Sequence, residues 1–286
     1  MTDTSLAAIP PEKRIAFQGE PGAYSELACA TFAPDFIPFP CPTFEAALNL
    51  VSRGDAGHAM LPVENSLAGR VADFHHLLPD TDLHIIADHF LAVHHQLLVP
   101  PGTAIETLRT VRSHAMALGQ CRKIISELGL KAEVAGDTAG AAKHLSQTKT
   151  PGVAVIASKA AAERYGLEII RSNIEDAGHN TTRFLEMSRE PSDPTPGDGM
   201  IMTSFVFQVR NIPAALYKAL GGFATNGVNM TKLESYMREG SFQATQFYID
   251  IEGHPEDTAV RLALEELSFF SSSFKVLGVY QSGRRA

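Results

Sequence analysis

Short apolar runs alternate with amphipathic stretches over residues 14–187. Runs of strand length occupy residues 14–18, 56–61, 110–112, 131–134 and 153–157. Apolar residues recur at helical spacing in residues 24–32, 44–51, 71–78, 115–128, 138–145 and 159–165. This alternation predicts an α/β fold with a parallel-rich sheet that carries helices on both faces.

A long and mostly extended stretch, residues 83–100, interrupts the alternation. We interpret it as a crossover between two α/β lobes, and the chain after Leu167 as the return to the first lobe. The predicted catalytic domain, residues 13–189, then divides into lobe 1 (about 13–85 and 175–189) and lobe 2 (about 90–174). Because a cleft between lobes is the default ligand site, we place the site at the hinge, beside Thr182.

A change of composition marks a second domain. Residues 190–199 contain three prolines, two glycines and no large apolar residue, which predicts a linker over residues 190–201. Beyond it, strands are predicted at 203–209, 228–237, 242–251 and 274–280, and helices at 213–225 and 256–267. The order βαββαβ predicts an α+β, ferredoxin-like domain over residues 202–281.

Composition and charge narrow the range of partners. The chain has 286 residues, of which 44% are hydrophobic and 20% charged, as in ordinary globular proteins. The formal net charge is −8 and no basic run occurs, so no nucleic-acid partner is expected. An anionic substrate would need a locally positive pocket, because the global field repels it.

Cysteine usage and the apolar runs bear on the compartment. Cys29, Cys41 and Cys121 are scattered and form no CxxC pair, which indicates reduced thiols. The first twelve residues lack the basic start and apolar core of a signal peptide. No apolar run reaches the ~18 residues of a membrane span. We therefore expect a cytoplasmic protein without a membrane partner.

The stretch HNTTRF at residues 179–184 contains several side chains that can bind a ligand or take part in a reaction. A polar turn gives way there to an apolar run, which predicts a loop entering a strand. Arg183 can bind a carboxylate through two parallel hydrogen bonds, and Thr182 offers a hydroxyl beside it. The alternative is an ordinary strand start with a surface arginine.

Two further loops carry groups suited to an anion. A glycine turn at residues 19–22 leads into the helix that starts at Tyr24, and the first N–H groups of a helix lack internal partners. The strand at 56–61 ends in a polar loop that contains Glu64, Asn65 and Ser66. Each loop can instead be a plain connection between a strand and a helix.

Histidines crowd the region before residue 96, but their spacing does not predict a metal site. They are His75, His76, His84, His89, His94 and His95. No HExxH motif is present, and the adjacent His94 and His95 point to opposite faces of a strand. We expect no metal.

Ser113, at a strand end, either turns its hydroxyl into the cleft or caps the following helix.

Four motifs in order give the chain a family resemblance. They are FQGEPGAYSE at 17–26, PVENS at 62–66, SH with ALGQC at 113–121, and NTTRF at 180–184. With the βαββαβ unit behind them, the chain resembles monofunctional prephenate dehydratase with a C-terminal ACT regulatory domain, over residues 14 to about 280. The resemblance implies a two-lobed catalytic domain like that of type II periplasmic binding proteins.

The resemblance also implies a reaction. Prephenate dehydratases convert prephenate to phenylpyruvate, water and CO2 in phenylalanine biosynthesis, need no cofactor, form homodimers or homotetramers, and are inhibited by L-phenylalanine at the ACT domain. Thr182 matches the threonine required for activity. Its hydroxyl is expected to assist the departing ring hydroxyl, and Arg183 to hold a carboxylate or to fix the loop. Glu64 can act as an acid if burial raises its pKa.

The site residues implied by these matches form three sets. The catalytic set is Thr182, Arg183, Phe184 and Glu64. The substrate-binding set is Ala23, Tyr24, Ser25, Asn65, Ser66, Ser113, Asn180 and Thr181. The phenylalanine-binding set is Pro213, Ala214, Ala215, Leu216, Asn229, Met230, Thr231, Leu233, Glu234 and Ser235.

The chain departs from the family pattern at three places. Ala115 and Met116 replace a common Pro-Gln pair, Tyr236 and Met237 replace an Arg-Pro pair, and Ala214 replaces a glycine. The last two affect the expected affinity for phenylalanine. Arogenate dehydratase, whose substrate differs by one amino group, fits the same residues, and a non-catalytic amino-acid sensor is the alternative from another class.

Overall fold

The computed structural model describes residues 9–197, 199–210, 212–237 and 244–284. The predicted strand at residues 14–18 is β1 (Arg14–Gln18), and it pairs in parallel with β2 (Ile37–Cys41) and β3 (His58–Asn65). Ile15, Ala16 and Phe17 of β1 are fully buried, as their apolar character predicts. The helices α2 (Tyr24–Phe32) and α3 (Phe44–Ser52) contact these strands.

The first sheet is completed by segments distant in sequence. Its order is β2-β1-β3-β11-β5, with β4 (Gly69–Arg70) paired to β3. Strand β5 spans His84–Ala92 and β11 spans Thr181–Ser188. The stretch at 83–100 is extended as predicted, but it forms two strands in two sheets, since β6 (Gln96–Val99) belongs to the second sheet.

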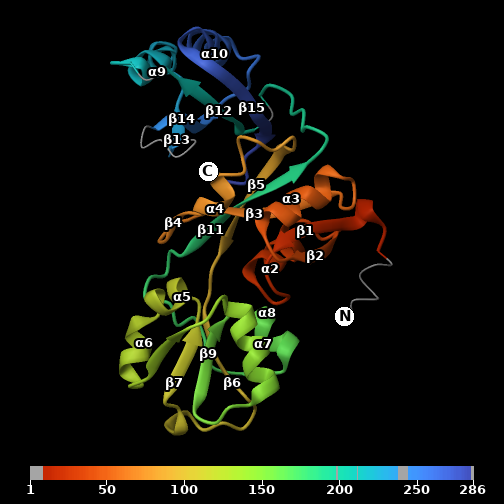
Figure 1. The fold of residues 1–286 in the computed structure, drawn as a ribbon, viewed down its shortest axis with the longest axis vertical. Helices are drawn as coiled ribbons and strands as arrows, with labels where there is room; N and C mark the ends of the chain where they lie inside the picture. Colours follow the sequence, from red (N-terminus) through yellow and green to blue (C-terminus); the bar gives the residue numbers. More distant parts are fainter. Residues whose placement is uncertain (1–8, 198, 211, 238–243, 285–286) are drawn as a thin grey trace. The chain divides into compact units, whose positions relative to one another are not determined.

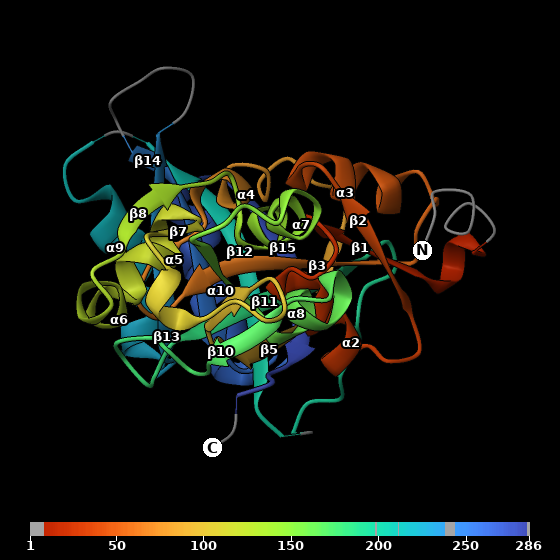
Figure 2. The same cartoon turned by 90° about the horizontal axis from the view of Figure 1, so that it is seen from below.

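The second sheet has the order β10-β6-β9-β7-β8. The strands β7 (Thr110–Ser113), β8 (Lys131–Val134) and β9 (Val153–Ala157) are parallel to one another. Strand β6 is antiparallel to both of its neighbours, β9 and β10 (Glu168–Arg171). Figures 1 and 2 place helices on both sides of this sheet, as predicted. One side carries α5 (Ala115–Gln120) and α6 (Arg122–Glu127), and the other carries α7 (Thr138–Thr148) and α8 (Lys159–Tyr165).

The single helix predicted over residues 115–128 is wrong. The chain forms α5 and α6 there, separated by Cys121 with φ −123° and ψ 32°. The Asp176 carboxylate accepts hydrogen bonds of 3.0 Å from the peptide N–H groups of Arg122 and Lys123. A carboxylate from a distant segment thus satisfies the new helix start, which no local pattern could indicate.

The predicted βαββαβ order is observed in the C-terminal part. It consists of β12 (Ile201–Val209), α9 (Ala215–Thr225), β13 (Met230–Met237), β14 (Ala244–Glu252), α10 (Thr258–Phe270) and β15 (Ser271–Gln281). The sheet is antiparallel with the order β13-β14-β12-β15, and α9 and α10 lie on one of its faces (Figure 1). Phe205 and Phe207 of β12 and Phe223 of α9 are in the core between these layers.

The chain divides into two compact units, and the division differs from the predicted boundary. Unit 1 comprises Met1–Val71 and Phe90–Phe184, and unit 2 comprises Ala72–His89 and Leu185–Ala286. Within unit 2, the backbone of β15 approaches β5 so closely that a Cβ on Gly278 would lie 2.1 Å from the Ile85 carbonyl oxygen. This approach explains why the outer halves of β5 and β11 group with the C-terminal sheet.

Three other segments differ from what their local patterns predict. Strand β2 contains two prolines, which are tolerated because β2 is at the edge of its sheet. Strand β10 was not predicted, and the helix predicted at 71–78 is only α4 (Ala72–His75).

Between Ser188 and Ile201, no described residue belongs to a helix or strand, in accord with the predicted linker. Across the described ranges, we find no helix with the length and apolar character to cross a membrane.

Candidate active site

Thr182 is the second residue of β11 and is half-buried. Its Oγ1 accepts a hydrogen bond of 2.9 Å from the Asn65 amide. In the part of the chain that the structure describes, the Thr182 hydroxyl donates to no protein acceptor. Its proton is therefore available to a ligand, since a hydroxyl can donate and accept at once.

The orientation of the Asn65 amide is set by the backbone. Its Oδ1 accepts hydrogen bonds from the peptide N–H groups of Leu67 (3.0 Å) and Ala68 (2.9 Å), which can only donate. Its Nδ2 must therefore face away, and it donates to Thr182 Oγ1 and to Asn180 Oδ1 at 2.8 Å. Both amide hydrogens of Asn65 are used, so Thr182 Oγ1 is held as an acceptor.

The same network continues into the lobe built on the second sheet. The buried Asn180 donates from Nδ2 to Gln120 Oε1 at 3.0 Å. Gln120 Oε1 also lies 2.9 Å from His95 Nε2, and His95 Nδ1 lies 2.8 Å from the Tyr24 hydroxyl. Gln120 belongs to one of the four motifs but was not predicted as a site residue. Its partners are distant in sequence, so the motif match was the only signal for it.

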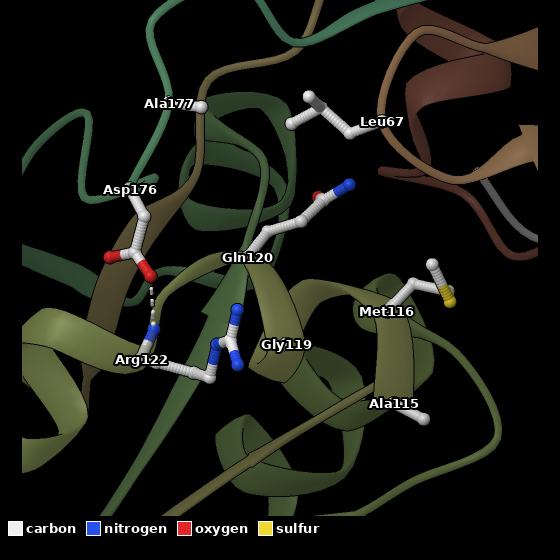
Figure 3. Close-up of a pocket in the computed structure, with 8 residues that line it drawn as sticks. All are labelled: Leu67, Ala115, Met116, Gly119, Gln120, Arg122, Asp176 and Ala177. Carbon is white, nitrogen blue, oxygen red and sulfur yellow. Dashed lines mark hydrogen bonds between the residues drawn. The ribbon is translucent and has the colours of Figure 1, made fainter.

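A cavity of about 430 Å³ opens beside Gln120. It is lined by Leu67, Ala115, Met116, Gly119, Gln120, Arg122, Asp176 and Ala177. Figure 3 shows the Gln120 amide extending toward Leu67, with Met116 on the same side of the cavity. Ala115 and Met116, two of the departures from the family pattern, thus line the cavity.

Arg122 supplies a cation to this cavity, and the sequence pattern did not predict it. Its side chain is exposed and lines the cavity (Figure 3). It forms no ion pair with any residue of the described ranges. The neighbouring Asp176 carboxylate is occupied by two peptide N–H groups. Arg122 and Asp176 both line the cavity, so Arg122 offsets the charge of Asp176 and offers a cation that can contact an anionic ligand.

Arg183 does not occupy the position of an open carboxylate clamp. Its side chain is 2% exposed, its Nη1 lies 3.1 Å from Glu64 Oε1, and its guanidinium carbon lies 5.9 Å from the Phe90 ring centre. Successive residues of a strand point to opposite faces, so Arg183 points away from the face that Thr182 shares with the network. The arginine fixes the end of β3 to β11, which was the alternative role. Glu64, with a side chain 25% exposed, is its ion-pair partner.

Two predicted site residues are buried inside a lobe. Phe184 is 1% exposed and packs in the core with Ile15, Phe17 and Met60. Ser113 is fully buried, and its hydroxyl donates to the Ile156 carbonyl at 2.6 Å, between neighbouring strands. Each side chain thus has packing or hydrogen-bond partners inside its own lobe.

The glycine turn before α2 engages one of the peptide N–H groups that were predicted to bind an anion. The Ala23 N–H donates to the Glu20 carbonyl at 3.0 Å, and the Gly22 carbonyl accepts from Ser158 at 2.6 Å. Gly22 packs on α8, since a Cβ there would lie 3.0 Å from the Ala161 Cα. Ser25 is buried in α2. Of this predicted set, only the Tyr24 hydroxyl joins the network.

Ser66 and Thr181 link the two loops that carry the site. The Ser66 N–H donates to the Thr181 carbonyl at 2.8 Å, and the Thr181 N–H donates to Ser66 Oγ at 3.0 Å. The Ser66 hydroxyl in turn donates to the His179 carbonyl at 2.8 Å. These bonds hold Asn65 and Thr182 side by side, and they leave the Ser66 hydroxyl proton engaged.

Burial keeps the network neutral near pH 7. It raises the pKa of Tyr24 well above the ordinary value and lowers the pKa of His95. Burial also raises the pKa of Cys121 to about 12, so this thiol is no nucleophile. Burial alone would raise the pKa of Glu175, but hydrogen bonds from His94 and from the His95 N–H hold it below the ordinary value.

The structure shows no metal centre among the residues it describes. No group of three or more His, Cys, Asp or Glu side chains there could hold a metal ion. The crowded histidines have other partners. His94 contacts Glu175, His89 contacts Glu186 at 2.8 Å, and His75 contacts the Tyr236 hydroxyl at 2.7 Å.

The predicted phenylalanine-binding residues lie on two elements of unit 2. Pro213, Ala214, Ala215 and Leu216 are at the start of α9, and the others are on or just before the edge strand β13. Ala214 has φ +61°, a left-handed conformation that favours glycine. Tyr236, which replaces the family arginine, is buried against His75.

Known proteins match the chain over most of its length. The family model for prephenate dehydratase matches residues 15–192. The bifunctional N-acyl-homoserine lactone acylase/prephenate dehydratase of Komagataeibacter europaeus is 54% identical over 270 residues, which cover 94% of this chain and 96% of that protein. Arogenate dehydratase/prephenate dehydratase 2 of Arabidopsis thaliana is 40% identical over 276 residues, which cover 93% of this chain and 72% of that protein.

A solved structure extends the comparison to the fold. The prephenate dehydratase of Arthrobacter aurescens in complex with L-Phe is 29% identical and superimposes with a TM-score of 0.87, covering 96% of this chain and 92% of that one. The match includes both the two-sheet part and the βαββαβ part. The chain belongs to the prephenate dehydratase family.

Proposed function

We propose that the chain converts prephenate to phenylpyruvate, CO2 and water, with Thr182 as the hydrogen-bond donor to the departing hydroxyl. One observation carries this assignment. The Asn65 amide, oriented by two peptide N–H groups, donates to Thr182 Oγ1 and leaves the hydroxyl proton for a ligand. A donor fixed before the substrate arrives is the arrangement that stabilises charge developing in a transition state.

The reaction needs little covalent chemistry from the protein. The electron pair of the bond between the ring and its carboxylate moves into the ring, CO2 leaves, and the ring C–O bond breaks with its electrons on the hydroxyl oxygen. That oxygen takes up a proton and leaves as water, and the ring becomes aromatic. A hydrogen bond from Thr182 stabilises the oxygen as negative charge grows on it.

Hydrogen-bond donors around the cavity can bind the carboxylates of the substrate. Prephenate carries two carboxylates, and the exposed cation of Arg122 and the Gln120 amide line the cavity. An arginine binds a carboxylate through charge-assisted hydrogen bonds, and an amide NH2 donates two more. We assign carboxylate binding to these two residues in place of Arg183, and we assign Arg183 and Glu64 to holding β3 against β11.

The test is phenylpyruvate release by the purified protein from prephenate and phenylalanine release from arogenate. We expect prephenate to be the better substrate as judged by kcat/KM. Turnover of arogenate alone would assign the chain to arogenate dehydration, an activity for which the Arabidopsis relative is named. Absence of turnover with both substrates would favour a non-catalytic amino-acid sensor.

We also propose that the βαββαβ domain is an ACT domain that binds L-phenylalanine and inhibits the enzyme. The superposition with the L-Phe complex from Arthrobacter aurescens supports this assignment. The exposed apolar side chains Met230 and Leu233 on the edge strand β13 suit the pairing of two such domains in a homodimer or homotetramer. Phenylalanine added to the prephenate assay should slow turnover, and turnover unaffected by phenylalanine would contradict this assignment.

A second candidate activity is hydrolysis of an N-acyl-homoserine lactone to a fatty acid and homoserine lactone. The 54% identity with the bifunctional relative favours it, and so do the exposed apolar side chains of Leu67 (38%) and Met116 (45%) at the cavity, which can contact an acyl chain. Incubation with a medium-chain substrate should release the free lactone. The Met116→Gln variant, which restores the common family residue, should then lose acylase activity more than dehydratase activity.

A further inference from the structure

The hydrogen bonds around Gln120 have only one possible direction. The peptide N–H groups of Leu67 and Ala68 fix Asn65 Oδ1 as an acceptor, so Asn65 Nδ2 donates to Asn180 Oδ1. Asn180 Nδ2 must then face Gln120, and the Gln120 atom that receives this bond must be its carbonyl oxygen. The direction follows from donor and acceptor chemistry, not from the placement of atoms in an amide.

The same logic fixes the tautomer of His95. Gln120 Oε1 can only accept, so His95 Nε2, at 2.9 Å, must carry a proton. The Tyr24 hydroxyl lies 2.8 Å from His95 Nδ1 and 3.0 Å from the His94 carbonyl oxygen. In a neutral imidazole that is protonated on Nε2, Nδ1 can only accept, so in its contact with His95 the tyrosine is the donor. His95 is 2% exposed, and burial lowers its pKa, which favours the neutral ring.

With its oxygen held by two donors, the Gln120 amide has one orientation. Its NH2 group faces the cavity, and it donates to no acceptor within the described ranges. Figure 3 shows the amide extending into the cavity toward Leu67. Two N–H donors at this place suit an anionic or carbonyl oxygen of a ligand.

We propose that His95 and Tyr24 are positioning residues, which hold the Gln120 amide with its NH2 group turned into the cavity for the substrate. The predicted effect on kcat/KM rests on the proposed dehydratase function. The predicted tautomer of His95 does not. His95 acts from a segment that joins the two lobes, and Tyr24 acts from α2 of the first lobe, whereas Gln120 ends α5 of the second lobe. The orientation of the donor therefore depends on both lobes being in place.

The structural test is nitrogen NMR of the protein with 15N-labelled histidine. The His95 signals are identified by their absence in His95→Gln. We expect the wild-type protein at pH 7 to show a protonated Nε2 and an unprotonated Nδ1, and we expect Tyr24→Phe to shift this ring toward a mixture of tautomers. The opposite tautomer in the wild type, or a spectrum unchanged in Tyr24→Phe, would overturn the proposal. This result does not depend on whether prephenate is the substrate.

The kinetic test compares two substitutions at the same position. His95→Gln keeps an N–H donor near the Nε2 position, whereas His95→Leu removes it. We expect His95→Leu to lower kcat/KM for prephenate about tenfold, mainly through KM, the scale of one neutral hydrogen bond. We expect His95→Gln to stay within about threefold of wild type on the same scale.

The control is His144→Leu on the exposed face of α7, which should leave both constants unchanged. Circular dichroism and thermal unfolding should show that all variants are folded. Equal activity of His95→Leu and wild type would overturn the proposal, as would equal loss in both His95 variants. If the wild-type protein turns over no prephenate, the dehydratase assignment fails, and the NMR result alone decides the positioning role.

Discussion

The Asn65 amide donates a hydrogen bond of 2.9 Å to the Thr182 hydroxyl oxygen, although 117 residues separate the two in the sequence. The bond defines what Thr182 can do, because it occupies a lone pair and leaves the proton. Asn65 and Thr182 belong to two of the four motifs of the family. This hydrogen bond brings the two motifs together in one candidate site.

The Asn65→Asp substitution should lower kcat for prephenate by roughly 10²–10³, the scale of a lost oriented donor. A carboxylate cannot donate to Thr182 Oγ1 or to Asn180 Oδ1, and it would compete for the threonine proton. Steady-state kinetics measures the change. Asn49→Asp, on the exposed face of α3, is the matched control and should keep wild-type kcat. A kcat for Asn65→Asp near that of the control would separate Asn65 from the chemistry.

The Arg122→Ala substitution should raise KM for prephenate about tenfold with a smaller effect on kcat, since a charge-assisted hydrogen bond is worth about 1.5–3 kcal/mol. Arg122 is a cation at the cavity, and in the proposed assignment it binds a carboxylate in both the ground state and the transition state. Lys131→Ala, which removes an exposed cation away from the cavity, is the control. If both variants have the same KM as wild type, Arg122 is not a substrate ligand.

The free energy of unfolding should decrease at acid pH because His95 is buried in the folded protein. Burial holds its folded-state pKa below the unfolded value of about 6.5, so the unfolded chain binds the proton more readily. The stabilising contribution is present above the unfolded pKa and is lost as the pH falls through the folded pKa. The groups that face the ring are Tyr24, His94, Gln120 and Glu175.

Urea unfolding at pH 7 and at pH 5 measures this loss. The free energy of unfolding should decrease more for the wild type than for His95→Gln, because glutamine does not titrate. Parallel decreases in the two proteins would show that His95 is not the group responsible.

The Ala214→Gly substitution should increase the free energy of unfolding by about 1 kcal/mol, because Ala214 is held at φ +61°. Ala224→Gly, at an exposed position in the last turn of α9, is the control of opposite sign and should lower the free energy of unfolding by up to about 1 kcal/mol. Denaturant unfolding monitored by circular dichroism gives both values. Destabilisation by Ala214→Gly would mean that this left-handed conformation is not adopted in solution.

Most elements and their order could be predicted from local pattern, because burial alternates with strand and helix period, but β2 and β10 were not predicted. The bounds of β1, α2 and α8 agree with prediction to the residue. The break between α5 and α6 could not be predicted. It depends on Asp176, which lies more than 50 residues later in the chain and caps the second helix.

The site was predicted in part. The motifs identified Thr182, Asn65 and Asn180, which the structure brings together. They also suggested Arg183 as a clamp, since a sequence does not reveal that Arg183 is buried beside Glu64, away from the hydrogen bonds of Thr182. Gln120 and Arg122 were not predicted as site residues. They line a cavity that both lobes form together, and a local sequence pattern does not reveal such a cavity.

The central claim is that the Thr182 hydroxyl proton serves the departing oxygen of prephenate, and Thr182→Val tests it most directly. We predict that kcat falls by roughly 10²–10⁴ while substrate binding is largely kept, and that Thr182→Ser, which retains the hydroxyl, recovers most of the activity. A Thr182→Val variant with kcat within about threefold of wild type would contradict the account, since a lost transition-state hydrogen bond costs more than that.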